Sequence, residues 1–300
     1  ILWSLIKFRP KLIYFTSSIR GLAFYRDFLL SLSWKIYSLF KKTEVFYHYH
    51  TKGVSDFANS NFINLLLTKF FLNKVNLILL SEALKYDFKK IDTYKNIYFL
   101  PNAVEDEVKN IAFDEFAKIK FQKSKTLQIL YLSNMIKSKG YFEVLKLAKE
   151  KKESEFHFHF AGKWKNKVDE EEFFEFLKKN DLNENVTFHG FVSGEQKKEL
   201  LKKAHIFIFP SRYPKEAFPL SIIEALSFGI PVIASNEGAT SSILDRKSGI
   251  LIENAHELPE ALLKAQSSLI NYESSIYCRQ RFLKNFNSET FEKNFKRIVN

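Results

Sequence analysis

Short runs of β-branched and aromatic residues alternate along the chain with longer stretches whose apolar residues recur at helical spacing. The short runs have the length and composition of strands, and the longer stretches have the period of amphipathic helices. In the first half, strands are expected at residues 11–16, 44–48, 76–80 and 96–100, with a helix at 62–73. Such alternation is typical of a parallel sheet covered by helices.

The second half repeats this alternation more regularly. Six strands are expected there, at residues 127–132, 155–161, 186–189, 206–209, 231–234 and 249–252. Helices are expected between and after them, at residues 141–152, 170–180, 194–203, 220–228, 239–244 and 258–266. A last helix at 288–299 has Phe291, Phe295 and Ile298 on one face.

A turn signal separates the halves, because Pro101 and Asn102 precede a charged segment that runs to residue 125. We therefore expect a first domain at 1–110, a second at 111–285, and a C-terminal helix at 286–300 that can return to the first. The expected fold class is α/β, with two Rossmann-like parallel-sheet domains facing across a cleft. Ligands of such sheets bind at the carboxyl ends of the strands.

The net charge and the cysteine content limit which partners and which cellular compartment are expected for the protein. The net charge is +12, and residues 1–110 alone hold 16 Lys and Arg against 9 Asp and Glu. This balance fits a membrane surface or an anionic substrate, or simply a basic exterior, whereas no nucleic-acid module of known spacing is present. The single cysteine, Cys278, excludes an intrachain disulfide and favours an intracellular protein.

The apolar stretches do not predict a membrane-spanning helix. Charged residues interrupt both residues 21–40 and residues 62–80. Lys7 and Arg9 break the first apolar run, so a signal peptide is not expected. Because the chain begins with Ile1 and its only methionine is Met135, we expect that an N-terminal segment is missing.

The segment from residue 209 to residue 224 carries the strongest chemical pattern. A strand end is followed by a loop with Glu216 and then by a helix that begins near Pro219 and bears Glu224. The free N–H groups of a first helical turn form an anion site suited to a diphosphate. The two carboxylates could bracket that diphosphate and bind sugar hydroxyls on either side.

This segment, with its continuation to residue 235, resembles the signature of the retaining family-4 glycosyltransferases of GT-B fold. Both have Glu, seven residues, Glu, and then a helix end, a glycine and a Pro-Val strand. Further matches occur in the family's order, at residues 101–104, 132–140, 160–162, 186–191 and 204–211. The first domain would then face the acceptor, the second would bind the nucleotide sugar, and the first would be incomplete.

The resemblance implies roles for particular residues. Lys139 would bind the donor diphosphate, Glu216 the transferred sugar and Glu224 the ribose hydroxyls. His50, favoured over His48, would reach the donor sugar from the first domain. The backbone around the helix start would hold phosphate and sugar, and one loop would lie against the base; these residues are Phe218, Pro219, Leu220, Ser221, Gly190 and Phe191.

One position departs from the family pattern. Asn134 stands where the family usually has arginine, which weakens the expected stabilisation of the leaving diphosphate. Arg212 or Lys137 could substitute. His157 and His159 lie on one face of a strand without a carboxylate or cysteine nearby, so they indicate packing rather than a metal site. No Gly-x-Gly-x-x-Gly or Walker loop is present, and no cofactor besides the donor substrate is expected.

The predicted reaction transfers a hexosyl unit from a nucleoside-diphosphate sugar to an acceptor hydroxyl, with retention and without metal. The acceptor would be a saccharide or a lipid-linked acceptor in the synthesis of cell-envelope polysaccharide or glycolipid. The protein would be cytoplasmic, with peripheral membrane contact at the inner surface as a further hypothesis. Two alternatives stay open: a non-catalytic sugar-nucleotide-binding subunit, and a nucleotide-sugar epimerase of the same fold.

Overall fold

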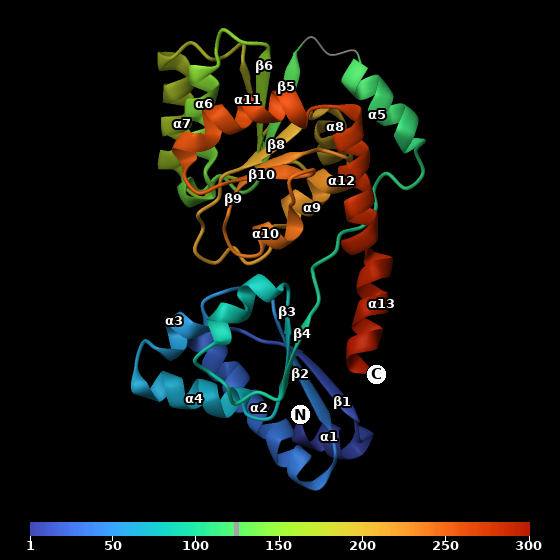
Figure 1. Ribbon diagram of the computed structural model, residues 1–300. Coiled ribbons are helices and arrows are strands. Elements are labelled where there is room, and N and C mark those ends of the chain that lie inside the picture. Colours follow the sequence, from blue (N-terminus) through green and yellow to red (C-terminus); the bar gives the residue numbers. More distant parts are fainter. Residues whose placement is uncertain (123–125) are drawn as a thin grey trace. The chain divides into compact units, whose positions relative to one another are not determined.

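The computed structural model describes residues 1–122 and 126–300 (Figure 1). The chain forms two compact units. Unit 1 comprises residues 1–102, 214–218 and 291–300, and unit 2 comprises residues 103–213 and 219–290. Each unit contains one sheet with helices packed on it, and all strand pairs are parallel.

Unit 1 holds a four-stranded sheet whose order, β1-β2-β3-β4, follows the chain. The strands are β1 (Leu12–Thr16), β2 (Glu44–Tyr49), β3 (Asn76–Leu79) and β4 (Asn96–Phe99). They agree with the four expected strands to within a residue. The connecting segments contain α1 (Leu2–Phe8), α2 (Gly21–Phe40), α3 (Val54–Ala58), α4 (Phe62–Leu72) and the 3₁₀ helix η1 (Glu82–Phe88).

Alternate residues of this sheet face two different apolar layers. Tyr47 is buried against Trp34 of α2 and Phe71 of α4, and the Trp34 indole donates a hydrogen bond to the Tyr47 hydroxyl at 2.9 Å. On the opposite face, Phe46 and its neighbours pack against Phe291, Phe295 and Ile298 of the C-terminal helix α13 (Ser288–Val299). Burial of each of the aromatic side chains Trp34, Phe46, Tyr47 and Phe71 stabilises the unit by about 1.5–3 kcal/mol.

Unit 2 holds a six-stranded sheet in the order β10-β9-β8-β5-β6-β7. The strands are β5 (Leu127–Leu132), β6 (Phe156–Ala161), β7 (Val186–Phe188), β8 (Ile206–Phe209), β9 (Val232–Ser235) and β10 (Gly249–Ile252). The helices are α5 (Phe113–Gln122), η2 (Lys137–Lys139), α6 (Tyr141–Glu150), α7 (Lys167–Lys179), α8 (Gly194–Lys203), α9 (Leu220–Ser227), α10 (Thr240–Ile243), η3 (Ala255–Glu257), α11 (Leu258–Ser268) and α12 (Tyr272–Asn285).

The strand order of unit 2 reverses between β5 and β8. From β5 the chain moves through β6 to β7 at one edge, and from β8 it moves through β9 to β10 at the other. Ile129 of β5 is paired with Ile206 of β8 at this point. The loops that leave these two strands therefore diverge, and ligands of open parallel sheets bind at such a switch point.

Several helices differ from the sequence expectation. Helix α7 begins three residues earlier than expected, because the Asn166 side chain accepts a hydrogen bond from the Asp169 N–H at 2.8 Å and caps the first turn. Helix α5 forms within the segment that was expected to be only a charged connection. Helix α12 was not anticipated, since most of its residues are polar.

Helix α12 holds α9 in place. Its buried Arg279 donates two hydrogen bonds of 2.7 Å to the Asp106 carboxylate and one of 3.0 Å to the carbonyl of Ser227, at the end of α9. A buried arginine is stable only when it is paired in this way. Within the described residues, no helix combines the length and apolarity needed to cross a bilayer.

Candidate active site

Two loops of unit 2 meet at the switch point, one after β5 and the other after β8. Lys139, half-buried, ends the short helix η2 between β5 and α6. Its Nζ lies 6.0 Å from the ring centroid of Phe209, the last residue of β8, and 5.4 Å from that of Tyr213. The aromatic faces hold the ammonium group beside the carboxyl end of β8.

Backbone contacts lock these loops together. The Arg212 N–H donates a hydrogen bond of 2.7 Å to the Ser138 carbonyl. Gly140 lies against Pro210 with a φ of 84°, and a Cβ at this position would be 2.5 Å from the Pro210 carbonyl oxygen. Only glycine fits both the positive φ and the close approach.

A third loop, after β6, joins the same group. The Gly162 N–H donates a hydrogen bond of 2.8 Å to the carbonyl of Gly190, which follows β7. A Cβ at residue 162 would be 1.7 Å from the carbonyl oxygen of Ser133, so this approach also requires glycine. Asn134 is exposed in the first loop, and the ring of Phe191, beside Gly190, is 68% exposed. An exposed ring at a strand end can stack on a planar group such as a nucleobase.

Helix α9 begins directly after Pro219, which occupies the N-cap position with a φ of −69°. Leu220 is exposed and Ser221 is half-buried in its first turn. The first amides of a helix have no acceptor within the helix, and the helix dipole adds a partial positive charge there. The start of α9 therefore presents N–H groups suited to an anion.

Glu224, half-buried within α9, forms an ion pair that the sequence did not reveal. Its Oε1 accepts a hydrogen bond of 2.7 Å from Nζ of Lys197 on α8. The pair fixes one carboxylate oxygen of Glu224. Lys197 could not be singled out beforehand, because four of the ten residues of α8 are lysines.

Glu216 and Phe218 lie in the stretch 214–218, which groups with unit 1, whereas Glu224 belongs to unit 2. Glu216 is half-buried and Phe218 is buried. Glu216 precedes Pro219 by three residues, so the chain itself keeps it close to the start of α9. The structure therefore does not bring the two glutamates together within one compact unit.

The two histidines at the end of β2 differ in accessibility. His48 is fully buried, and its Nδ1 lies 2.6 Å from the Tyr14 hydroxyl. His50 is exposed directly after the strand, with Nδ1 3.2 Å from the Oδ1 of Asn102. Burial lowers the pKa of His48 to about 3, and desolvation also lowers the pKa of His50. Of the two, His50 alone can meet a ligand.

The two cations suggested as substitutes for an arginine at position 134 are arranged differently. Nζ of Lys137 lies 2.5 Å from the Glu172 carboxylate and 3.6 Å from Asp169, so this lysine is engaged with α7. These carboxylates raise the pKa of Lys137. Arg212 is exposed in the loop after β8, beside Lys139's own loop. Arg212 is therefore the better placed of the two.

The histidines of β6 are part of a hydrogen-bonded ladder across the sheet. His159 lies 2.9 Å from His189 and 2.7 Å from the Gln128 side chain, and His157 lies 2.8 Å from Thr187. Among the described residues, no group of three potential ligands is placed to hold a metal ion.

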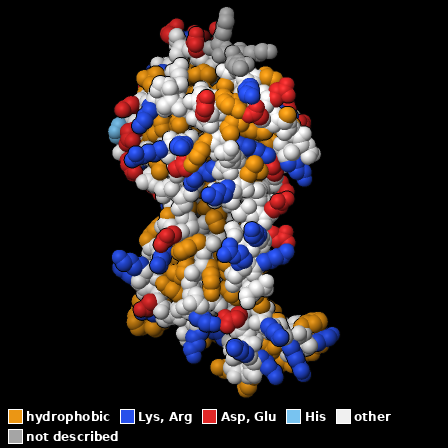
Figure 2. Space-filling view, turned by 45° about the vertical axis from the view of Figure 1, so that its right-hand side comes forward, with side chains coloured by type: hydrophobic (Ala, Val, Ile, Leu, Met, Phe, Trp, Pro, Cys, Tyr) orange, Lys and Arg blue, Asp and Glu red, His pale blue; other side chains and the backbone are white. Residues whose placement is uncertain are grey.

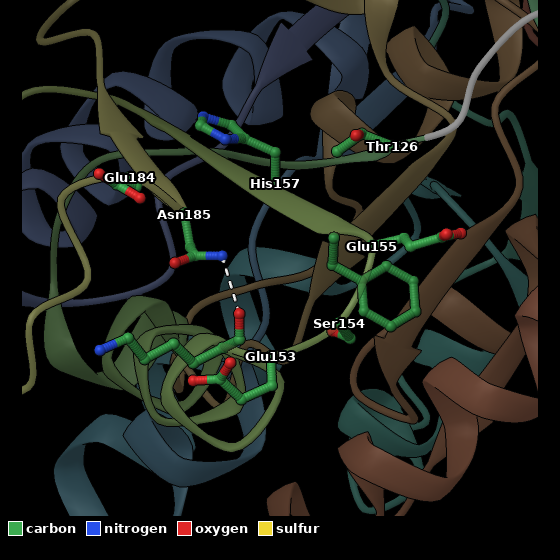
Figure 3. A pocket seen from close by; sticks show the side chains of 9 residues that line it. Thr126, Glu153, Ser154, Glu155, His157, Glu184 and Asn185 are labelled. Carbon is green, nitrogen blue, oxygen red and sulfur yellow. Dashed lines mark hydrogen bonds between the residues drawn. The ribbon is translucent and has the colours of Figure 1, made fainter.

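A pocket of about 400 Å³ lies at the amino ends of β5, β6 and β7 (Figure 3). Thr126, Glu155 and Asn185, which immediately precede these strands, line it, and the Asn185 side chain donates to the Lys152 carbonyl at 3.0 Å. None of the predicted site residues lines this pocket. It is at the opposite end of the sheet from the loops at the switch point.

Comparison with known proteins places this geometry in a family. The family model described as glycosyl transferases group 1 matches residues 112–285, more than half of the chain. An uncharacterized 41.2 kDa protein in the cps region of Klebsiella pneumoniae is 30% identical over 144 residues, covering 47% of this chain and 37% of that protein. The D-rhamnosyltransferase WbpZ of Pseudomonas aeruginosa is 38% identical over 61 residues, covering 20% of this chain and 16% of WbpZ.

Solved structures show the same fold at low identity. Anabaena Alr3699/HepE in complex with UDP has a TM-score of 0.77 and 14% identity, covering 99% of this chain and 81% of that one. A glycosyltransferase from Rickettsia africae has a TM-score of 0.76 and 17% identity, covering 99% and 78%. With the two parallel sheets, these likenesses confirm a GT-B fold built from Rossmann-like units. The chain belongs to the group 1 glycosyltransferases.

Proposed function

We propose that the protein transfers a hexosyl unit from a nucleoside-diphosphate sugar to an acceptor hydroxyl, with retention at the anomeric carbon. One observation carries this proposal: Lys139 and the start of α9 belong to the two loops that leave the switch point of the unit 2 sheet. A cation and free helix amides at such a point suit a diphosphate.

Each site residue has a proposed role toward the donor. Lys139 and the amides of Leu220 and Ser221 would stabilise charge on the leaving diphosphate, as preorganised donors do in a transition state. Glu224, with one oxygen held by Lys197, would use the other for the ribose hydroxyls. The exposed ring of Phe191 would stack on the base.

The sugar would be bound by two residues that group with unit 1. Glu216 would accept hydrogen bonds from its hydroxyls, and His50 would reach it from the end of β2. This part of the proposal includes exclusion of water from the bound sugar. It is supported by the resemblance of Glu216–Glu224 to the signature of the retaining family-4 enzymes, and by the exposure of His50.

The proposed chemistry needs no metal and no separate general base. The bond between the anomeric carbon and the diphosphate oxygen breaks, and the acceptor oxygen attacks from the same face. The acceptor proton passes to the departing diphosphate, which leaves as a nucleoside diphosphate. Arg212 would add positive charge at the position left neutral by Asn134.

The relatives favour a saccharide or lipid-linked acceptor in cell-envelope polysaccharide or glycolipid synthesis. One relative is named for the cps region, and another is named a D-rhamnosyltransferase. The HepE structure holds UDP, which is one candidate for the nucleotide of the donor. The proposal places the reaction in the cytoplasm.

The decisive experiment incubates the purified protein with a panel of radiolabelled nucleotide sugars and saccharide or lipid-linked acceptors. Transfer is expected with one of the donors, and it should be lost in Glu216→Ala and in Glu224→Ala. Glu175→Ala, an exposed glutamate on α7, is the matched control and should keep activity. The anomeric configuration of the product, read by NMR, tests retention.

Other outcomes would decide for the alternatives. Epimerised donor without transfer would indicate an epimerase, and tight donor binding without turnover would indicate a binding subunit. Full activity in both glutamate variants, with unchanged circular dichroism, would overturn the site assignment.

A further inference from the structure

A hydrogen bond between two side chains of unit 1 joins the loops that follow β2 and β4. His50 follows β2, Asn102 follows β4, and β3 lies between these two strands in the sheet. Because the carboxyl ends of parallel strands lie at the same edge of a sheet, residues after β2 and β4 can meet across the end of β3. Nδ1 of His50 lies 3.2 Å from Oδ1 of Asn102. This contact therefore ties the two loops together.

A buried carboxylate fixes the backbone of the loop that carries His50. The oxygens of Asp87, in η1, accept hydrogen bonds of 2.7–2.9 Å from the N–H groups of Gly53, Val54 and Ser55. Hydrogen bonds to an ionised group are stronger than those between neutral groups, so this loop has little freedom. The orientation of the His50 ring then depends on its side-chain contacts.

A second imidazole packs against the ring of His50. The ring centroids of His48 and His50 are 4.1 Å apart, with an angle of 40° between the ring planes. His48 is fully buried, its Nδ1 lies 2.6 Å from the hydroxyl of Tyr14, and the Tyr14 ring packs edge-on against Phe295 of α13. Two imidazoles at this distance repel each other when both are charged. The contact therefore favours the neutral form of both rings.

The contact with Asn102 determines which nitrogen of the neutral His50 ring carries the proton. Desolvation lowers the pKa of His50, so the ring is neutral at neutral pH. A neutral imidazole has a proton on one nitrogen and a lone pair on the other. Oδ1 of Asn102 can only accept a hydrogen bond, and the proton of His50 is therefore on Nδ1. Nε2 then has the lone pair and acts as a hydrogen-bond acceptor.

Such an acceptor differs from the polar groups that are common on the surface of unit 1. In Figure 2 the lower part of the molecule, which holds unit 1, shows blue Lys and Arg side chains among hydrophobic ones. Ammonium and guanidinium groups can only donate hydrogen bonds, whereas a sugar hydroxyl can also donate one to an acceptor. A neutral His50 supplies that acceptor without adding negative charge toward a donor whose diphosphate is already anionic.

We propose that Asn102 is a positioning residue, which fixes the proton of His50 on Nδ1 and so presents Nε2 as an acceptor to a hydroxyl of the transferred sugar. This inference deepens the proposed function, on which it rests for the contact between His50 and the sugar. The sugar must then have a hydroxyl, or an amide N–H, at the position that faces His50. An ether or a carboxylate at that position would leave Nε2 without a donor and would bind less well.

NMR can locate the proton of His50 directly. Long-range proton–nitrogen correlation of the full chain, with isotope-labelled histidine, distinguishes the Nδ1–H form of a neutral imidazole from the Nε2–H form at about pH 8. The chain has seven histidines, and comparison with His50→Gln identifies the signals of His50. We expect the Nδ1–H form. The Nε2–H form would overturn the proposal, because the Asn102 side chain would then donate to Nδ1 through its amide nitrogen.

Variants of Asn102 test whether this residue holds the proton. Asn102→Ala removes the acceptor, so signals of the Nε2–H form should appear. Asn102→Asp keeps an acceptor and should retain the Nδ1–H form, while its charge should raise the pKa of His50 by about 1 or more. Asn73→Ala, at an exposed asparagine that ends α4, is the matched control and should leave the His50 signals unchanged. Unchanged His50 signals in folded Asn102→Ala would overturn the proposal.

Variants of His50 test the acceptor role with the nucleotide sugar that the radiolabelled panel identifies. His50→Ala should lower kcat/KM about tenfold, because the sugar hydroxyl loses its partner. His50→Gln should recover part of this loss through its amide oxygen, whereas His50→Lys can only donate and should be as slow as His50→Ala. Equal rates in the glutamine and lysine variants would overturn the acceptor role.

The NMR measurement needs no donor, so it separates failure of this inference from failure of the proposed function. A proton on Nδ1 of His50 that moves in Asn102→Ala, in a chain that transfers no sugar, would support the role of Asn102 and count against the transferase. Transfer by a chain whose His50 carries its proton on Nε2 would support the transferase and overturn the role of Asn102.

Discussion

Units 1 and 2 are both parallel sheets covered by helices, yet they use their polar groups differently. In unit 2, Lys139 and Glu224 are placed by neighbouring loops and helices at the carboxyl side of the sheet. In unit 1, the buried Asp87 accepts hydrogen bonds from the N–H groups of Gly53, Val54 and Ser55, at 2.7–2.9 Å, and so serves the fold itself.

The outer surfaces differ as well. Helix α8 of unit 2 is polar outside, with lysines and glutamates in ion pairs, whereas α2 of unit 1 exposes leucines. The comparison teaches that the two units expose different groups. Unit 2 holds Lys139 at the end of β8, where a diphosphate is proposed to bind, whereas unit 1 exposes apolar side chains on α2.

The largest expected effect on stability comes from a glycine in the unit 2 loops. In Gly162→Ala the added Cβ would overlap the Ser133 carbonyl oxygen at 1.7 Å, so the loops after β5, β6 and β7 could not keep their contacts. We expect the free energy of unfolding to fall by about 4 kcal/mol, as for other severe steric overlaps. Urea denaturation followed by circular dichroism measures it.

The matched change in unit 1 is Gly21→Ala, at the start of α2. Gly21 has a φ of 65°, but nothing lies within 4 Å of the added Cβ. Only the backbone conformation is then strained, at a cost of about 1 kcal/mol. Equal losses in the two variants would show that the unit 2 loops are not closely packed.

The next largest effect concerns the cation at the switch point. Lys139→Ala should lower the transfer rate about 100-fold, because it removes a preorganised charge from the leaving diphosphate. Lys149→Ala, at the far end of α6, is the control and should leave the rate unchanged. A rate that stays within a factor of two in Lys139→Ala would mean that the diphosphate lies elsewhere.

Most strands and helices of both units could be predicted from the sequence, because the two kinds of element differ in length and in the spacing of their apolar residues. The segment at residues 209–224 indicated the loop and helix that the structure shows. The strand order, and therefore the switch point, could not be inferred, since it depends on which strands pair across long separations. Nor could the pairing of Arg279 with Asp106, which are 173 residues apart.

The sequence also did not indicate which apolar helix faces are covered by other elements. Residues 21–40 were recognised only as an apolar stretch interrupted by charges, and their composition does not tell that Trp34 is buried while Leu39 is 79% exposed. Glu224 was predicted from a motif, whereas its partner Lys197 belongs to a lysine-rich helix in which no member stands out. Side chains that act through tertiary contacts leave no periodic signal.

A smaller effect is expected on the pH dependence of stability, through the buried His48 of unit 1. Burial holds the pKa of His48 at about 3 in the folded chain, against 6.5 when it is exposed. The neutral ring is thus favoured by folding, so stability from this residue is complete above pH 6.5 and is lost as the pH falls toward 3. Between pH 7.5 and pH 5.0 this loss should be about 2 kcal/mol.

Urea denaturation at both pH values measures the loss for the unaltered chain and for His48→Gln, which cannot titrate. The variant should lose about 2 kcal/mol less stability than the unaltered chain over this interval. His256→Gln, which replaces an exposed histidine of unit 2, is the matched control. If His48→Gln and the unaltered chain show the same slope, His48 is not kept neutral by burial.

The smallest expected effect is on the KM for the donor, and it tests whether Lys197 acts through Glu224. The pair is partly exposed, with 29% and 23% of the two side chains accessible, so its contribution is about 1 kcal/mol or less. Lys197→Met should therefore raise the KM for the donor up to about fivefold and leave kcat unchanged, because Glu224 is proposed to bind the ribose and not the reacting carbon. Lys202→Met removes a similarly exposed, paired lysine from the same helix, and its kinetics should be unaltered. A fall in kcat without a change in KM would instead place Glu224 next to the reacting carbon. Glu224 would then not be the residue that binds the ribose at the switch point.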